Sequence, residues 1–330
     1  MLASLWIKSL VTVTLLVVFL VFVTNVDIGL FLCARTIPII KTTEVNAIQN
    51  NDGEVHPMFK NPQDREFVDI LPTSKDLEES YFIVFMIPSH PSNMNSREVI
   101  RNTWANVAGW SLLKDENAYK KKIRVMFVCG SIPSQNFTAL FEEEVAEKDD
   151  MFVVKNITEG RTSLRYKEMW AMRYAHEHYN FIYLVKTDDD VTVNLPVLIR
   201  DLAALPRGYH YMGLCMHNVG SPPQRWKYCS GGGYVLSRDL ITEMLHLPDT
   251  VHIPRMKPED VFTGWLVWNV NNNTQHAVKA RYVHAALALH PYKCGPLNKW
   301  FYHGYKNVDI EERQRDVQNY FMDNSPVNCT

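Results

Sequence analysis

Residues 181–194 of this chain read FIYLVKTDDDVTVN. The first five of these residues are apolar and mostly β-branched or aromatic, which predicts a strand buried on both faces in the middle of a mostly parallel sheet. Three carboxylates follow at the C-terminal end of that strand. Side chains alternate between the two faces of extended backbone, so Asp188 and Asp190 should share one face while Asp189 points the other way.

Two carboxylates on one face repel each other, and a divalent cation between them, or beside a bound polyphosphate, would relieve that repulsion. Carboxylate oxygens are hard ligands that suit Mg²⁺ or Mn²⁺. The carboxyl ends of parallel strands are also where ligands bind in α/β proteins. A solvated acidic turn is the simpler alternative, but such a turn rarely follows so apolar a strand.

The composition describes an ordinary folded protein. The 330 residues are 46% hydrophobic and 21% charged, which allows a sizeable core in one large or two ordinary domains. The net charge of -2 gives no electrostatic reason to expect nucleic acid as a partner. Six cysteines do not make a disulfide scaffold, and no spacing resembles a zinc site. We prefer a disulfide between Cys215 and Cys229, while the sequence leaves other pairings open.

The N-terminal part predicts a membrane anchor. Residues 9–26 carry no charge and can span a bilayer, and Lys8 before them predicts that residues 1–8 form a cytoplasmic tail. Residues 27–80 are polar and irregular, as in a stem, and residues 81–330 form the body. A cleaved signal peptide is the alternative, although its apolar region would be shorter. Sequons that agree with a lumenal or extracellular body begin at Asn136, Asn156, Asn272 and Asn328.

The body alternates predicted strands with predicted helices, which is typical of βαβ units. Strands are expected at residues 81–87, 123–130 and 151–155, and helices near residues 95–107, 137–147, 163–175, 194–206, 237–245 and from 258 onward. Asn95 and Glu98 have the spacing of a capping box at the first helix. Arg97 and Arg101 share another face of that helix. They could reach a diphosphate, or they could form a basic solvated face.

Two further stretches contain candidate binding residues. Lys167 is a possible phosphate contact, with an exposed lysine on a helix face as the alternative. Residues 228–234 read YCSGGGY, in which the glycines permit close backbone approach to a ligand and the aromatic faces suit sugar rings. Gly232 and Gly233 are therefore candidate binding residues. A glycine hinge without a ligand is the alternative.

An acidic pair opens the last predicted helix. Pro258 suits the first turn of a helix, and Glu259 and Asp260 then lie at the positive end of its dipole. That position alone could explain the two carboxylates structurally. It would also keep Asp260 ionised and available as a base.

In this order the motifs resemble those of the β-1,3-glycosyltransferases of the galactosyltransferase family, known as family 31, whose members are type II Golgi membrane enzymes. The resemblance covers roughly residues 81–294. The matching stretches are Arg97 to Trp104, Lys186 to Asn194, Tyr228 to Ser237 and Glu259 to Gly264.

The chain departs from the family pattern in two places. Glu159, Arg161 and residues 163–165 stand before Lys167, where many members carry an Asp, a Tyr and an Asn-Leu-Thr segment. The spacer at residues 217–227 is short. The resemblance implies that both regions could shape the choice of sugar or acceptor.

The resemblance implies a GT-A fold, which is a nucleotide-binding α/β sandwich with an acceptor-binding half. It implies inverting transfer of a hexose from a UDP-sugar to a glycan acceptor, with galactose the first expectation and GlcNAc or GalNAc the second. It implies that Asp190 and His290 bind Mn²⁺ or another divalent cation and that Asp188 and Asp189 position the donor. Asp260 would take the acceptor proton. A packed or surface histidine is the alternative for His290.

Two other classes of protein remain as alternatives. A membrane-tethered carbohydrate-binding protein without turnover is disfavoured by the intact Asp190 and Asp260. A metal-dependent phosphodiesterase would need more clustered His and Asp ligands than this chain has. The sequence leaves oligomerisation open.

Overall fold

The computed structural model describes part of the chain, all of it within one of two units, Asn50–Thr330. The described residues are 80–106, 123–130, 139–154, 157, 159–161, 163–219, 226–247, 258–273, 279–282, 287–289 and 300–303. The predicted tail, anchor and stem up to residue 79 lie outside them. Among the described residues, none belongs to a helix with the length and hydropathy needed to cross a bilayer.

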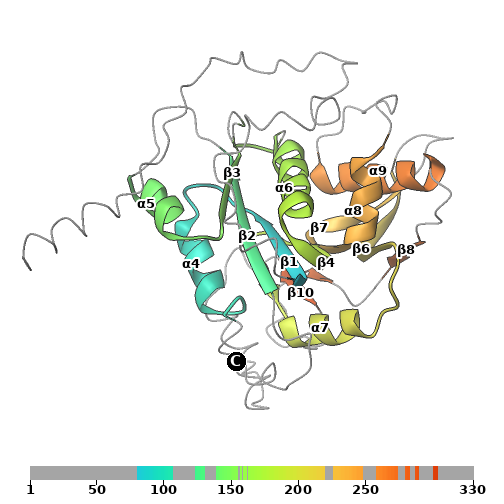
Figure 1. Cartoon of the computed structure of the whole chain (residues 1–330), viewed down its shortest axis with the longest axis horizontal. Coiled ribbons are helices and arrows are strands. Elements are labelled where there is room, and N and C mark those ends of the chain that lie inside the picture. The colour runs from blue at the N-terminus through green and yellow to red at the C-terminus, as the bar shows by residue number, and fades with distance from the viewer. Residues whose placement is uncertain are drawn as a thin grey trace, which may run out of the picture. The chain divides into compact units, whose positions relative to one another are not determined.

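A seven-stranded sheet forms the centre of this unit, with the strand order β3-β2-β1-β4-β7-β6-β8 (Figure 1). Its strands are β1 Ser80–Pro88, β2 Ile123–Gly130, β3 Met151–Val154, β4 Asn180–Lys186, β6 His210–Val219, β7 Trp226–Ser237 and β8 Lys279–Tyr282. The first four strands along the chain pair in parallel, whereas β7 is antiparallel to both β4 and β6. The predicted central strand is confirmed as β4, between β1 and β7.

A second, three-stranded sheet holds β10 between β5 and β9. Its strands are β5 Thr192–Val193, β9 Leu287–Leu289 and β10 Phe301–His303. Because β10 is antiparallel to β5, which directly follows the aspartates, the distant C-terminal segment lies beside the end of β4.

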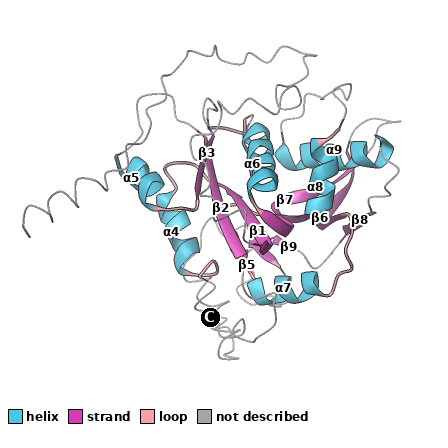
Figure 2. Ribbon diagram, viewed as in Figure 1, coloured by secondary structure: helices cyan, strands magenta, loops and turns pink. Residues whose placement is uncertain are grey.

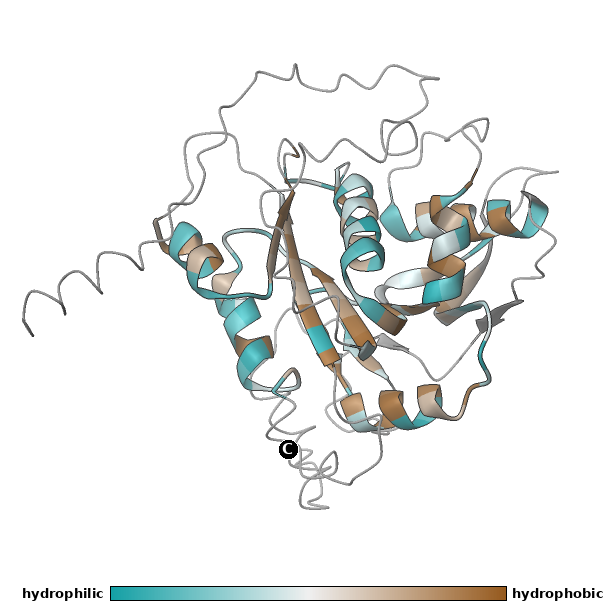
Figure 3. Ribbon diagram, viewed as in Figure 1, coloured by the Kyte–Doolittle hydropathy of each residue, from teal (hydrophilic) through white to brown (hydrophobic). Residues whose placement is uncertain are grey.

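Helices cover both faces of the large sheet (Figures 1 and 2). They are α4 Met94–Asn102, α5 Ala139–Glu147, α6 Leu164–His178, α7 Leu195–Ala203, α8 Arg238–Leu245 and α9 Glu259–Asn273. One apolar cluster joins α6, α8 and α9 to one face, and a second joins α4, α5 and α7 to the other. Alternate residues of β1 enter the two clusters: Val84 and Met86 enter the first, and Ile83 and Phe85 the second. Several strands, β2 and β3 among them, are accordingly drawn mostly in the brown of hydrophobic residues in Figure 3. The predicted α/β sandwich with a mostly parallel sheet is confirmed.

The observed N-terminal caps of the helices agree only in part with those predicted from the sequence. The side chain of Asn194 caps α7 by accepting a hydrogen bond from the Val197 amide, as predicted. The predicted capping box at Asn95 is wrong, because α4 begins at Met94 and places Asn95 inside the helix. Ser237 precedes α8, but its hydroxyl accepts a hydrogen bond from the His210 amide at 2.9 Å instead of capping the helix.

Candidate active site

The aspartates after β4 point in the two directions that alternation predicts. Ligand atoms of Asp188, Asp190 and His303 all lie within 4.8 Å of one another. Asp189 faces away, and its Oδ2 atom accepts hydrogen bonds from Ser89 Oγ at 2.7 Å and Asn93 Nδ2 at 2.9 Å. The shared face of Asp188 and Asp190 is therefore confirmed, and Asp189 is tied to the loop that follows β1.

The histidine in this cluster is one that sequence reasoning missed. His303 ends β10, and its Nε2 atom lies 3.4 Å from Asp190 Oδ1. The expected ligand, His290, lies outside the described residues. The only signal for His303 in the sequence is its place after the apolar run at residues 300–302. Such a run does not reveal which distant strand it will join.

The cluster fits a divalent cation. Asp190 Oδ1 is buried and makes no hydrogen bond with the described part of the chain. The close approach of His303 lowers the pKa of Asp190, and Asp190 in turn raises the pKa of His303. Burial raises the pKa of Asp188, although the ammonium of Lys186 opposes this shift. Two carboxylates suit Mg²⁺ or Mn²⁺, and the imidazole favours a transition metal such as Mn²⁺.

The glycine run of β7 serves the protein's own packing. A Cβ atom on Gly233 would lie 2.3 Å from Phe301 Cδ2, and one on Gly232 would lie 3.0 Å from His303 Nδ1. The space that these glycines leave is occupied by β10. Contact of these two glycines with a ligand stays a prediction, which this packing disfavours. The hinge is also disfavoured, because both glycines lie within a continuous strand. Their small size lets β10 approach β7, which brings His303 to Asp190.

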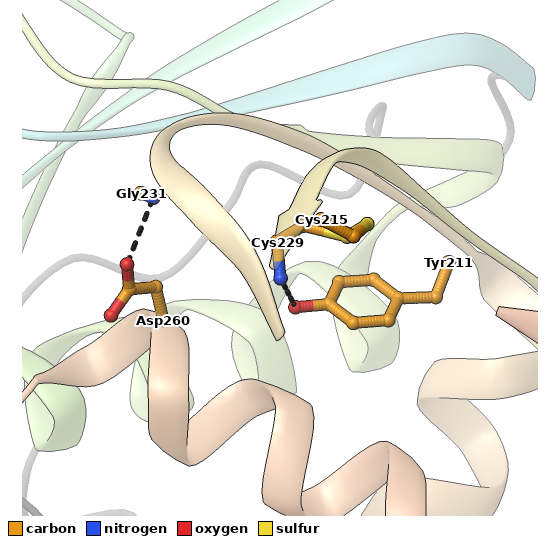
Figure 4. Close-up of a disulfide and its surroundings, with 5 residues drawn as sticks. All are labelled: Tyr211, Cys215, Cys229, Gly231 and Asp260. Carbon is orange, nitrogen blue, oxygen red and sulfur yellow. Dashed lines mark hydrogen bonds between the residues drawn. A yellow bond between two sulfur atoms is a disulfide. The ribbon is translucent and has the colours of Figure 1, made fainter. Parts of the chain in front are cut away.

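Asp260 lies in the first turn of α9, as predicted, and faces β7 (Figure 4). Its Oδ2 atom accepts a hydrogen bond from the Gly231 amide at 3.1 Å, and its Oδ1 atom accepts one from the Val261 amide at 2.8 Å. Burial, followed by the neighbouring charge of Glu259, raises the pKa of Asp260. The helix end was expected to favour the ionised form, but burial has the larger effect. A raised pKa brings this carboxylate closer to the pKa of an efficient general base.

The predicted disulfide between Cys215 and Cys229 is confirmed (Figure 4). It joins facing residues of β6 and β7. The hydroxyl of Tyr211 also accepts a hydrogen bond from the Cys229 amide at 2.8 Å. These links hold β7 just before Gly231, the residue whose amide binds Asp260.

The two arginines of α4 are bound by carboxylates within the chain. Arg97 is fully buried and pairs with Glu144 at 2.6 Å, so a solvated face is wrong for this residue. It also donates to Ser89 Oγ at 2.9 Å and so supports the loop that contacts Asp189. Arg101 pairs with Glu144 at 2.7 Å and with an Asp150 oxygen at 2.8 Å. Contact of either guanidinium with a diphosphate stays a prediction that these ion pairs disfavour.

Lys167 is likewise buried and ion-paired. Its Nζ atom lies 2.8 Å from Glu159 Oε2 and donates to the Ser89 carbonyl at 3.1 Å. The alternative of an exposed lysine is therefore wrong. Glu159, one of the departures from the family pattern, also accepts a hydrogen bond from the Gly130 amide. Glu159 and Lys167 together therefore connect Gly130 at the end of β2 with Ser89 after β1.

The fold belongs to the α/β class, in which ligands bind at the carboxyl ends of the strands, and the acidic residues of this chain lie at that edge. A sequence model described as Galactosyltransferase matches residues 95–277, which is more than half of the chain. The chain therefore belongs to the galactosyltransferase family.

Individual relatives are distant. UDP-GalNAc:beta-1,3-N-acetylgalactosaminyltransferase 1 of Homo sapiens is 26% identical over 236 residues, which cover 64% of this chain and 66% of that protein. Beta-1,3-galactosyltransferase 1 of Mus musculus is 24% identical over 268 residues, covering 75% and 73% of the two chains. Among solved structures, a glycosyltransferase involved in glycosylation of the major capsid of PBCV-1 aligns over 72% of this chain and 98% of that chain, with 13% identity and a TM-score of 0.35.

Proposed function

We propose that this protein is an inverting, divalent-metal-dependent β-1,3-glycosyltransferase with a GT-A fold. It moves a hexose, with galactose the first choice, from a UDP-sugar to a glycan acceptor of a glycoprotein, glycolipid or proteoglycan. The observation that carries the proposal is the joint presence, at the carboxyl edge of the sheet, of the Asp188, Asp190 and His303 cluster and of Asp260, a carboxylate held by two amides. Membership of the family supports it.

Asp190 and His303 would hold the divalent cation together with Asp188, a residue that the family resemblance had instead implied to position the donor. When bound, the cation neutralises charge on the diphosphate and makes UDP a better leaving group. Asp260 accepts the proton of the acceptor hydroxyl as the hydroxyl oxygen attacks the anomeric carbon of the donor sugar from the face opposite UDP. The new bond joins that oxygen to the anomeric carbon, the bond to the UDP oxygen breaks, and UDP leaves with both electrons. The Gly231 and Val261 amides keep the carboxylate of Asp260 oriented throughout.

The choice of donor is tested with a panel of UDP-sugars. The full-length protein is offered UDP-galactose, UDP-GalNAc and UDP-GlcNAc with and without Mn²⁺, and transfer and hydrolysis are measured. We expect Mn²⁺-dependent turnover, greatest with UDP-galactose. Greater turnover with UDP-GalNAc, the donor named in one relative, would correct only the sugar. Glycan binding without turnover of any donor would favour the carbohydrate-binding alternative, and turnover of generic phosphodiesters would favour the phosphodiesterase.

We further propose a single-pass type II protein of the Golgi membrane with the body in the lumen. The motivation is Lys8 before the uncharged residues 9–26, together with the sequons. Asn272, the acceptor of one sequon, is exposed near the end of α9. Treatment of the cell-expressed protein with an N-glycosidase should increase its electrophoretic mobility, while a variant lacking all four sequons should not respond. Unchanged mobility of the wild-type chain would contradict this orientation.

A further inference from the structure

Lys186, the last residue of β4, is a fully buried cation among acidic groups. Its Nζ atom lies 2.7 Å from Asp188 Oδ1 and 2.6 Å from the Gly231 carbonyl oxygen. Carboxylate oxygens of Glu168 and Glu259 each lie farther away, at 3.4 Å. One ammonium therefore contacts the turn after β4, the strand β7 and the helices α6 and α9, and its two shortest contacts are with Asp188 and Gly231.

These two contacts connect the candidate cation cluster with the candidate base. Asp188 belongs to the cluster with Asp190 and His303. Gly231 accepts from Lys186 through its carbonyl oxygen and donates from its amide to Asp260. The fit around Gly231 is close, because a Cβ atom there would lie 2.7 Å from Glu259 Oε1 and 3.2 Å from Lys186 Nζ. A side chain at residue 231 would displace the groups that Lys186 holds together.

A simpler role for Lys186 would be to neutralise Glu168, a buried carboxyl of α6. The distances disfavour this as its main role. Lys186 Nζ lies 3.4 Å from a Glu168 oxygen but 2.7 Å from Asp188 Oδ1, a difference of 0.7 Å. Burial also raises the pKa of Glu168, which favours the neutral form of this carboxyl and lessens its need of a counter-ion. Glu168 has another partner in the hydroxyl of Tyr234, at 3.3 Å.

We infer that Lys186 is a positioning residue for sugar transfer. It orients Asp188 in the cation cluster and, through Gly231, orients Asp260 toward the acceptor. The inference rests on the proposed function, since it concerns the geometry of that reaction. Lys186 does not contact the reacting atoms in this account. Its loss should therefore impair turnover without removing the cation site.

The test replaces the ammonium with an apolar side chain of similar length, Lys186→Met, in the full-length protein. Mn²⁺ binding is titrated without donor, and transfer is then measured at saturating Mn²⁺, donor and acceptor. We expect the variant still to bind Mn²⁺, because a positive charge has been removed from the vicinity of the cluster. Turnover per Mn²⁺ site should fall by about 10²-fold, the usual effect of a misplacement of about 1 Å. The KM for the UDP-sugar should change by less.

Two further variants separate positioning from charge balance. Glu168→Gln alone leaves the contacts of Lys186 with Asp188 and Gly231 in place and should keep turnover within a few fold of wild type. The double variant Lys186→Met with Glu168→Gln removes the cation and the carboxyl that the simpler role would pair with it. It should be more stable than Lys186→Met yet equally slow, and it carries the test if the single variant does not fold.

The outcomes are distinct. Turnover of Lys186→Met within tenfold of wild type, or recovery of turnover in the double variant, would overturn the inference and leave the proposed function standing. Loss of Mn²⁺ binding in Lys186→Met and in the double variant, with an intact melting transition, would also overturn the inference. The cation site itself would then depend on Lys186. A wild-type chain that transfers no sugar would refute the proposed function, and the inference with it.

Discussion

Replacing Asp260 with asparagine should separate the chemical step of the proposed reaction from donor binding. Asp260→Asn keeps the size of the side chain and its place at the start of α9, but the amide cannot take a proton from an acceptor hydroxyl. We expect transfer to fall by about 10² to 10⁴-fold, the usual contribution of a positioned base. This corresponds to about 3 to 5 kcal/mol of transition-state stabilisation. UDP affinity should barely change, because Asp260 is outside the cation cluster.

The same variant should remain folded. The two carboxylate oxygens of Asp260 accept from the amides of Gly231 and Val261, and asparagine keeps only one acceptor oxygen. Loss of one hydrogen bond to a charged group costs about 1 to 3 kcal/mol. Removal of a buried charge beside Glu259 offsets part of this cost. Since 1 kcal/mol shifts Tm by about 2 to 4 °C in a domain of this size, Tm should fall by less than about 10 °C.

The raised pKa of Asp260 gives the pH dependence a definite sign. Because burial and Glu259 raise the folded-state pKa, the folded protein binds this proton more tightly than the unfolded chain does. The contribution of Asp260 to stability is therefore greatest below its unfolded-state pKa and is lost as pH rises through the folded-state value. The acid limb of the kcat profile should lie at a higher pH than the ordinary pKa of aspartate would give. Asp260→Asn should abolish that limb in its residual activity.

The assay measures transfer with saturating UDP-sugar, UDP binding by calorimetry, and thermal unfolding on the same preparations. Glu259→Gln is the matched control, since it removes the adjacent carboxylate, and it should keep transfer within about tenfold of wild type. If Asp260→Asn lost UDP affinity and kept its turnover at saturating donor, Asp260 would be a donor-site residue. Glu259 would then be the next candidate base.

His303→Ala should raise the half-saturating Mn²⁺ concentration at least tenfold, because loss of even a partner of a metal ligand costs about 10 to 100-fold; unchanged Mn²⁺ dependence would exclude His303 as a ligand. Gly233→Ala should force Phe301 away from β7, destabilise the protein by about 1 to 3 kcal/mol and weaken Mn²⁺ activation as β10 moves. Wild-type stability and Mn²⁺ response in this variant would mean that β10 does not depend on the glycine. Replacing both Cys215 and Cys229 by serine should lower the free energy of unfolding in denaturant by about 3 kcal/mol, as expected for a loop of about 15 residues. A change below about 0.5 kcal/mol would show that the pairing of the two strands is sufficient without the disulfide.

The sequence predicted β1 to β4 and the helices because each of these elements has a local signal, whereas it did not predict the strands β6, β7 and β8. Five consecutive apolar residues before the aspartates identified β4 as a central strand, and alternation assigned Asp188 and Asp190 to one face. Pro258 and the acidic pair after it marked the start of α9 and so the place of Asp260. These signals depend on backbone geometry over a few neighbouring residues. Tertiary structure can shift such an element by a residue or two, as at Asn95, without removing it.

The partners of the functional side chains were decided only by the tertiary structure. Nothing beside Arg97 in the sequence shows that folding buries it against Glu144, and nothing near Asp190 points to His303. The sequence suggested that Gly233 contacts a ligand, with a hinge as the alternative, and only the packing of β10 shows that it makes space for Phe301. The sequence by itself determined which residues could carry charge or approach closely, because these are properties of each residue and its near neighbours. Only the tertiary structure decided which of these groups contact each other, because burial and pairing depend on contacts between segments far apart in the chain.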